Sequence, residues 1–89
     1  MKANKLFLFR PAVNWNRCGG AMIVCANFVE EAILLGNMYW KGGKDCDYTL
    51  SLNEPTNINS NYCIWVFTKE FALAEEQEVG VVFQDYNYV

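Results

Sequence analysis

The sequence contains no histidine. Histidine is the commonest general base near neutral pH, the usual partner of a serine or cysteine nucleophile, and the commonest metal ligand. The chain also lacks a Cys-x-x-Cys pair, and its cysteines are spaced too irregularly for a compact zinc site or disulfide framework: Cys18, Cys25, Cys46 and Cys63. We therefore expect free thiols, no bound metal, no cofactor and no catalytic residue.

Long hydrophobic runs are missing as well. No stretch approaches the roughly 18 consecutive apolar residues of a membrane-spanning helix. Residues 1–10 lack the long apolar segment and the small-residue cleavage site of a secretory signal. We expect a protein that stays in the cytosol and has no membrane partner.

Charged residues are also few, at 19% of the chain, whereas 53% of residues are apolar and 16% are aromatic. This balance is the opposite of the polar, highly charged composition of disordered chains. A chain of 89 residues can build one hydrophobic core at most. We expect residues 1–89 to form a single folded domain.

Short apolar and alternating runs predict strands over residues 5–10, 21–26, 48–52, 62–67 and 81–88. Asn27 and Glu30 are typical of a helix start, and Gly36 is typical of a helix end. Between them Phe28, Ala32 and Leu35 are spaced to form one apolar face. The fold class predicted is α+β, an antiparallel sheet of four to five strands with one helix packed on a face.

The remaining segments carry turn signals. Residues 11–20, which include Gly19 and Gly20, are expected to form turns, although the two ends of this stretch could pair as a wide hairpin. Residues 37–47 are expected to be a loop, although residues 38–40 are apolar enough to continue the helix. Residues 70–77 show no clear period and are expected to be a loop or turn.

Two pairs of carboxylates are the obvious candidates for acid–base chemistry, Asp45 with Asp47 and Glu75 with Glu76. Both pairs fall in stretches predicted to be loops, where solvated surface charge is the simpler interpretation. Glycines between Lys41 and Lys44 do not open a helix, as a phosphate-binding loop would. They predict a turn, with anion binding left open.

Charge is distributed unevenly along the chain. The first 29 residues contain four basic residues and no acid, and no base follows Lys69 in the acidic C-terminal part. A net charge of −3 argues against direct nucleic-acid binding, which needs a basic footprint. The acidic part is suited to a basic surface on a partner, including one that normally holds nucleic acid. A solubilising edge is the alternative.

The chain has more aromatic residues than so small a core can readily bury. Trp15 and Trp40 lie in predicted loops, and tryptophan is a frequent anchor of protein interfaces. The alternative is that these loops fold back over the core. A third use is stacking on a nucleotide, with Arg17, Lys41 or Lys44 contacting its phosphates.

Three consecutive segments, KLFLFRP, NWNRCGG and AMIVCANFVEEAILLG, carry a resemblance to a known class of proteins. Over residues 5–36 the chain resembles small phage and prophage proteins that begin with a strand, a loop, a second strand and a helix. Several proteins of that kind look like anti-CRISPR or other counter-defence inhibitors. The resemblance implies a binding protein and carries over no site residue.

Our leading hypothesis is therefore a phage-encoded, non-enzymatic inhibitor in the host bacterial cytosol. It binds a host protein or ribonucleoprotein defence complex and blocks the surface that handles nucleic acid. The predicted binding residues are Trp15, Arg17, Trp40, Glu70, Glu75, Glu76, Glu78 and Asp85. A nucleotide-binding or sponge protein and a minor virion component are the alternatives, and a homodimer is left open.

Overall fold

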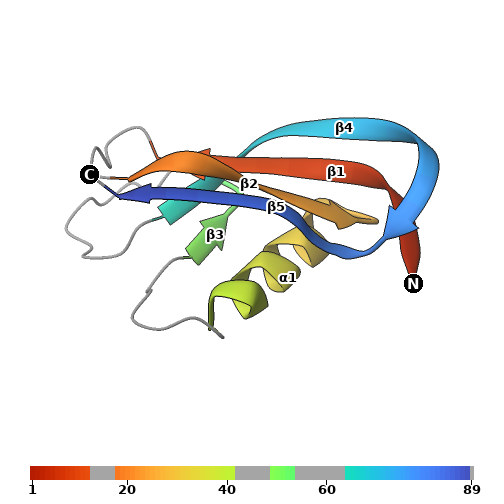
Figure 1. Ribbon diagram of the computed structural model, residues 1–89, viewed down its shortest axis with the longest axis horizontal. Helices are drawn as coiled ribbons and strands as arrows, with labels where there is room; N and C mark the ends of the chain where they lie inside the picture. The colour runs from red at the N-terminus through yellow and green to blue at the C-terminus, as the bar shows by residue number, and fades with distance from the viewer. Residues whose placement is uncertain (13–17, 42–48, 54–63, 89) are drawn as a thin grey trace.

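The computed structural model describes residues 1–12, 18–41, 49–53 and 64–88. One helix packs against one face of a curled five-stranded sheet (Figure 1), which confirms the α+β fold class. The elements in chain order are β1 Lys2–Pro11, β2 Cys18–Ala26, α1 Val29–Lys41, β3 Thr49–Ser51, β4 Ile64–Glu78 and β5 Gly80–Tyr88.

The strand order across the sheet is β3-β4-β1-β2-β5. β1 pairs antiparallel with both β2 and β4, and β5 pairs antiparallel with β2. β3 is parallel to β4, so the sheet is mixed and not wholly antiparallel as the sequence predicts. Parallel neighbours need a long connection, and the chain between Ser51 and Ile64 supplies it.

The core lies between the sheet and α1. Alternate residues of the central strands point to this side, so that Phe7 and Phe9 of β1 oppose Val24 and Met22 of β2. All four are at most 1% exposed, and Trp65 of β4 joins them at 0%. Within the described part of the strand predicted over residues 62–67, Trp65 alone is fully buried, and this strand, β4, is second from the edge and not central.

α1 begins close to the predicted position but by a different contact. The backbone N–H and the side-chain amide of Asn27 both donate to Oε1 of Glu31, at 2.7 and 3.1 Å. Glu31, and not Glu30, is therefore the acid that accepts hydrogen bonds from Asn27 at the start of the helix. Phe28, predicted to face the core, is 54% exposed because it precedes the first helical turn.

The helix does not end at Gly36 but continues to Lys41, so of the two alternatives for residues 38–40 the structure shows continuation of the helix. Gly36 is buried where α1 crosses the sheet, and a Cβ there would overlap Cδ1 of Leu50 and lie 3.1 Å from Sδ of Met22. The neighbouring Asn37 accepts a 2.8 Å hydrogen bond from the Leu50 N–H. The glycine permits close helix–sheet packing and is not a cap.

β4 continues through residues 70–78, where the sequence predicts a loop or turn. Its acidic run has low strand propensity, but pairing with β1 overrides that preference. Ala3 of β1 pairs with Gln77 and Lys5 pairs with Ala72, so residues 73–76 bulge out opposite a single residue of β1. We call residues 73–76 the arch.

The chain bends after the arch and enters β5 through Val79 and Gly80, which has a φ of 146°. The Val79 N–H donates to the Met1 carbonyl at 3.0 Å, so the bend is attached to the start of β1. Figure 1 shows β4 following β1 to this end of the sheet before β5 returns along β2.

The other strands predicted from the sequence are present, and two are longer than expected. β1 extends to Lys2 and Pro11, and β2 begins at Cys18. Gly19 and Gly20 therefore lie in a strand and not in a turn, with a φ of 101° at Gly20. Both glycines pair with residues of β5, Gly19 with Asn87 and Gly20 with Tyr86, and this pairing holds them in the strand.

Candidate functional site

The predicted binding residues do not form one described cluster. Trp15 and Arg17 lie outside the described residues. Trp40 belongs to α1 and Asp85 to β5, but their side chains also fall outside the described part of the chain. The four that remain lie on β4 and are exposed: Glu70, Glu75, Glu76 and Glu78.

Pairing of β1 with β4 brings basic and acidic segments of the chain together. Lys5 Nζ lies 3.7 Å from Glu70 Oε2, and the N-terminal ammonium of Met1 lies 3.4 Å from Glu78 Oε2. Exposed pairs of this kind contribute about 0–1 kcal/mol. Their main effect here is to neutralise two of the four carboxylates, which reduces the charge asymmetry seen in the sequence.

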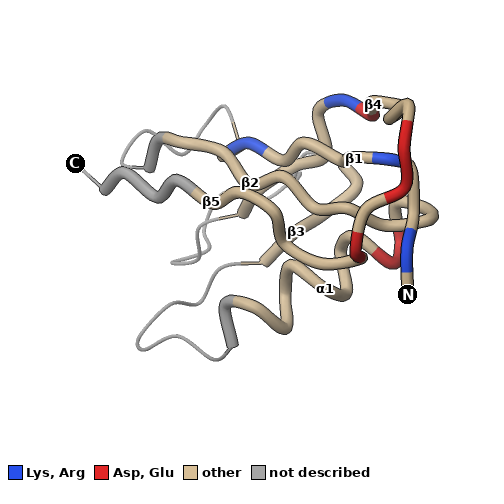
Figure 2. The backbone as a smooth tube through the Cα atoms, turned by 45° about the vertical axis from the view of Figure 1, so that its right-hand side comes forward, with Lys and Arg blue, Asp and Glu red and all other residues tan. Residues whose placement is uncertain are grey.

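Glu75 and Glu76 remain without a counter-ion. They are adjacent in the arch, both are exposed, and among the described residues no lysine or arginine lies within ion-pair distance of either. In Figure 2 the acidic residues of β4 gather along the end of the molecule that carries the N-terminus. The arch therefore presents two adjacent carboxylates that have no ion pair among the described residues.

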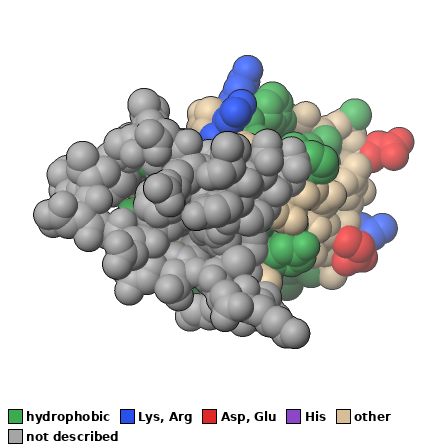
Figure 3. Space-filling model, turned by 60° about the vertical axis from the view of Figure 1, so that its left-hand side comes forward, with side chains coloured by type: hydrophobic (Ala, Val, Ile, Leu, Met, Phe, Trp, Pro, Cys, Tyr) green, Lys and Arg blue, Asp and Glu red, His purple; other side chains and the backbone are tan. Residues whose placement is uncertain are grey.

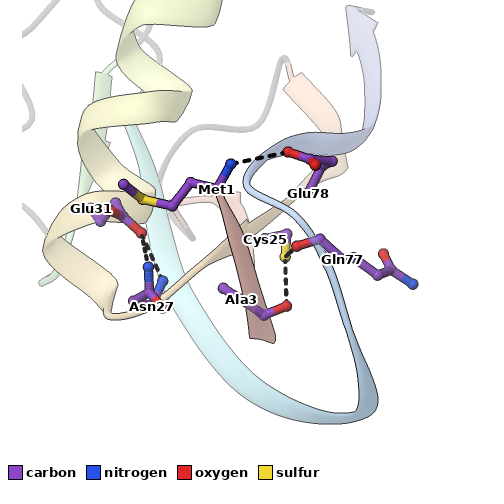
Figure 4. Close-up of polar contacts among 7 residues, drawn as sticks. All are labelled: Met1, Ala3, Cys25, Asn27, Glu31, Gln77 and Glu78. Atoms are coloured by element: carbon purple, nitrogen blue, oxygen red, sulfur yellow. Dashed lines mark hydrogen bonds and ion pairs between the residues drawn. The ribbon is translucent and has the colours of Figure 1, made fainter.

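Cys25 is the described residue that most resembles a nucleophile, but its surroundings are those of a core thiol. It is fully buried, and its Sγ lies 3.6 Å from the Ala3 carbonyl and 3.7 Å from the Gln77 carbonyl (Figure 4). Burial raises the pKa of the thiol above its ordinary value of 9.0. The group stays protonated and links the end of β2 to β1 and β4.

This environment predicts a pH effect on stability. Because the pKa of the folded thiol is raised, Cys25 is neutral in both states at pH 7, and only the unfolded chain loses the proton as the pH passes 9. We expect the free energy of unfolding to fall less steeply between pH 8 and pH 10 in Cys25→Ala than in the parent protein. Urea denaturation at each pH measures this difference.

Tyrosine and lysine side chains also titrate in this pH range, but they are the same in Cys25→Ala and in the parent protein, so their effects cancel in the difference between the two slopes. Identical slopes would contradict the assignment.

Other catalytic arrangements find no support among the described residues. No group of three or more Cys, Asp or Glu side chains there is placed to hold a metal ion. No helix described is long and apolar enough to cross a membrane. Asp45 and Asp47 lie outside the described residues, and Glu75 and Glu76 are exposed on the bulge of β4.

Comparison with known proteins adds no assignment. No protein-family model, curated protein or solved structure matches this chain. The function is therefore argued from the surfaces of the chain itself.

Two exposed apolar surfaces were missed by the sequence interpretation. The first is the outer side of α1, where Leu34 and Met38 are each 60% exposed. The signal was present, because the helix sequence is apolar on nearly every side and a surface helix normally has one polar face.

The second surface is the sheet face opposite α1. Leu8, Ile23 and Phe83 are paired in one row across β1, β2 and β5, and Phe71 lies near them on β4, with Lys69 Nζ 5.2 Å from its ring centroid. Phe83 and Phe71 are 50% and 39% exposed. Figure 3 shows hydrophobic side chains on the described part of the molecule between basic and acidic groups.

Proposed function

We propose that this chain is a phage-encoded, non-enzymatic inhibitor that binds a host defence complex in the bacterial cytosol. In this proposal the arch occupies the basic surface on which that complex handles nucleic acid. The resemblance of residues 5–36 to small phage counter-defence proteins supports the class of function.

One observation carries the proposal: Glu75 and Glu76 are adjacent and exposed on the bulge of β4, and no described lysine or arginine forms an ion pair with either. Two adjacent carboxylates on this unpaired bulge offer the concentrated negative charge that a phosphate-binding groove accepts. The arch is attached to the sheet on both sides, at Ala72 and Gln77. A partner therefore meets charges whose backbone is already ordered, which lowers the entropic cost of binding.

The test is affinity purification of the tagged protein from the bacterial host at low and high salt, followed by mass spectrometry. The retained complex should contain a nucleic-acid-handling protein and should dissociate as salt rises, because contacts between exposed charges are screened. Adding the purified chain should displace DNA or RNA from that complex.

The double variant Glu75→Gln/Glu76→Gln is expected to weaken binding about tenfold at low salt and to flatten the salt dependence. A matched control is Leu52→Lys/Asn53→Lys, which raises the net charge by the same two units at exposed positions after β3. The control should bind like the parent protein. Equal losses in both variants would show that net charge, and not the arch, determines binding.

A further inference from the structure

The outer face of the sheet, which points away from α1, is apolar where a solvated sheet face is normally polar. Directly paired residues share a face of a sheet. By this rule the register places five apolar side chains together on the outer face, Leu6, Leu8, Ile23, Phe71 and Phe83. Phe83 and Phe71 are 50% and 39% exposed, and the other three are half-buried. We call these five residues the outer patch.

The sequences of β1 and β2 also indicate that both faces of these strands are covered. Residues 6–9 and 21–25 are apolar at every position, although only alternate residues reach the core under α1. Strands that read as continuous apolar runs are typical of sheets buried on both faces. A second layer over the outer patch is therefore expected.

Unpaired charges of opposite sign lie at the two ends of the outer patch. Arg10 lies on the outer face because its neighbour Phe9 points into the core, and it is exposed. The arch bulges from β4 opposite Asn4, so Arg10 and the arch each lie three residues from Phe7 along β1, or about 10 Å. Among the described residues neither Arg10 nor the arch carboxylates form an ion pair.

The end of the molecule that carries the arch bends over the outer face. Cys25 points away from the core under α1, because its neighbour Val24 points into it. Its Sγ nevertheless contacts the carbonyls of Ala3 and Gln77 (Figure 4), which belong to the ends of β1 and β4. Gln77 directly follows the arch, so the negative charge of the arch is held beside the outer face.

A second copy matches this arrangement when the two outer faces pack against each other with their strands antiparallel. The two-fold axis then lies between the sheets, perpendicular to the strands at the level of Phe7 in the central strand β1. It places Arg10 beside the arch of the partner subunit at both ends of the contact. With the strands parallel, Arg10 would instead lie against Arg10 of the partner subunit.

The apolar residues also match in this arrangement. Leu8 lies over Leu6 of the partner subunit, since these positions are one residue on either side of Phe7. Phe83 is in the row of Leu8 and Gly80 is in the row of Leu6, so Phe83 lies over Gly80 of the partner subunit. A Cβ at Gly80 would meet no atom within 4 Å, which leaves room for an aromatic ring.

We propose that the outer face is the interface of a homodimer in which two sheets pack face to face with antiparallel strands. The dimer does not rest on the proposed function, since it requires only a second copy of the chain. If both hold, a second copy and the host complex compete for the arch, and the monomer is the form that binds the complex.

The available area is sufficient for a weak dimer. Four strands and six residues of β1 cover about 20 Å by 20 Å, or roughly 400 Å² in projection. Side chains that stand out from the sheet give an accessible area larger than the projection, which approaches the roughly 600 Å² per partner of the smaller specific interfaces. We expect a Kd of about 10–100 µM.

Sedimentation velocity of the purified chain, over a concentration series from about 1 to 500 µM, tests the dimer. The parent protein should pass from monomer to dimer within this range. Phe71→Gln/Phe83→Gln should remain monomeric throughout. The matched control Leu34→Gln/Met38→Gln removes two apolar side chains of α1 that are each 60% exposed, and it should dimerise like the parent. Far-ultraviolet circular dichroism verifies that each variant is folded.

Charge reversal tests the orientation without removing apolar surface. At low salt Arg10→Glu should weaken the dimer about fivefold, and combining it with Glu75→Lys/Glu76→Lys should recover part of the loss because opposite charges meet again. An unchanged Kd in Arg10→Glu would contradict the antiparallel packing. A parent protein that stays monomeric at every concentration overturns the proposal, and so does a dimer that only Leu34→Gln/Met38→Gln abolishes.

Discussion

Replacing Trp65 with alanine is expected to lower the free energy of unfolding by about 3–5 kcal/mol. Trp65 is 0% exposed and is the largest fully buried side chain among the described residues. It packs in the cluster that joins β1, β2, β3 and α1, so its removal leaves a cavity in the core. A domain of 89 residues has about 4–13 kcal/mol in total.

Urea denaturation followed by circular dichroism measures this loss, since the far-ultraviolet signal does not depend on the missing indole. Phe83→Ala is the matched control, because it also removes an aromatic ring but from a site that is 50% exposed. We expect the control to lose about 1 kcal/mol or less. Similar losses in both variants would contradict the placement of Trp65 at the centre of the core.

Replacing Gly36 with alanine is expected to destabilise the protein, although the same change stabilises most helices by about 1 kcal/mol. The new Cβ would overlap Leu50 Cδ1 and crowd Met22 Sδ at 3.1 Å. Leu50 and Met22 are 3% and 0% exposed, so neither side chain has free space into which to move. Overpacking costs about 1–3 kcal/mol, and we expect a net loss of about 1–2 kcal/mol.

A double-mutant cycle with Leu50→Ala tests the cause. Leu50→Ala alone should cost about 2–5 kcal/mol, and it removes the atom that Gly36→Ala would meet. Gly36→Ala should therefore be neutral or stabilising in the Leu50→Ala background, with a coupling energy of about 1 kcal/mol or more. Additive losses, or a stabilising effect of Gly36→Ala in the parent protein, would show that α1 does not approach β3 this closely.

Local patterns predicted the elements whose side chains alternate cleanly. The runs around Phe7 and Val24 are strands because every second residue enters the core. The strand around Leu50 was likewise visible from its alternation of polar and apolar residues. In these segments local preference and tertiary burial agree, so the sequence is sufficient to predict a strand.

The segments where prediction failed are those in which a distant strand or helix overrides local preference. Gly36 has the residue type of a helix end, but contact with Leu50 explains it as a packing site. Residues 70–78 contain four glutamates and no clear period, yet backbone pairing with β1 makes them a strand. Neither contact has a signal in the local sequence.

The candidate surfaces were also predicted only in part from the sequence. Sequence gave the location of Glu70, Glu75, Glu76 and Glu78 in one acidic segment, but it gave no information on their counter-ions. Strand pairing places Lys5 beside Glu70 and the N-terminus beside Glu78, so only the arch retains free negative charge among these four. The exposure of Leu34 and Met38 depends on which side of α1 packs on the sheet, and the sequence did not show that side.

The sequence by itself determined the size, the single core, the α+β class and the positions of most strands, because these depend on composition and short-range periodicity. Tertiary structure decided the strand order, the parallel pairing of β3, the length of α1 and β4, and the charges left unpaired. These features depend on contacts between residues far apart in the chain, such as Lys2 with Glu78. The physical reason is that backbone pairing and close packing are chosen by the whole fold and not by neighbouring residues.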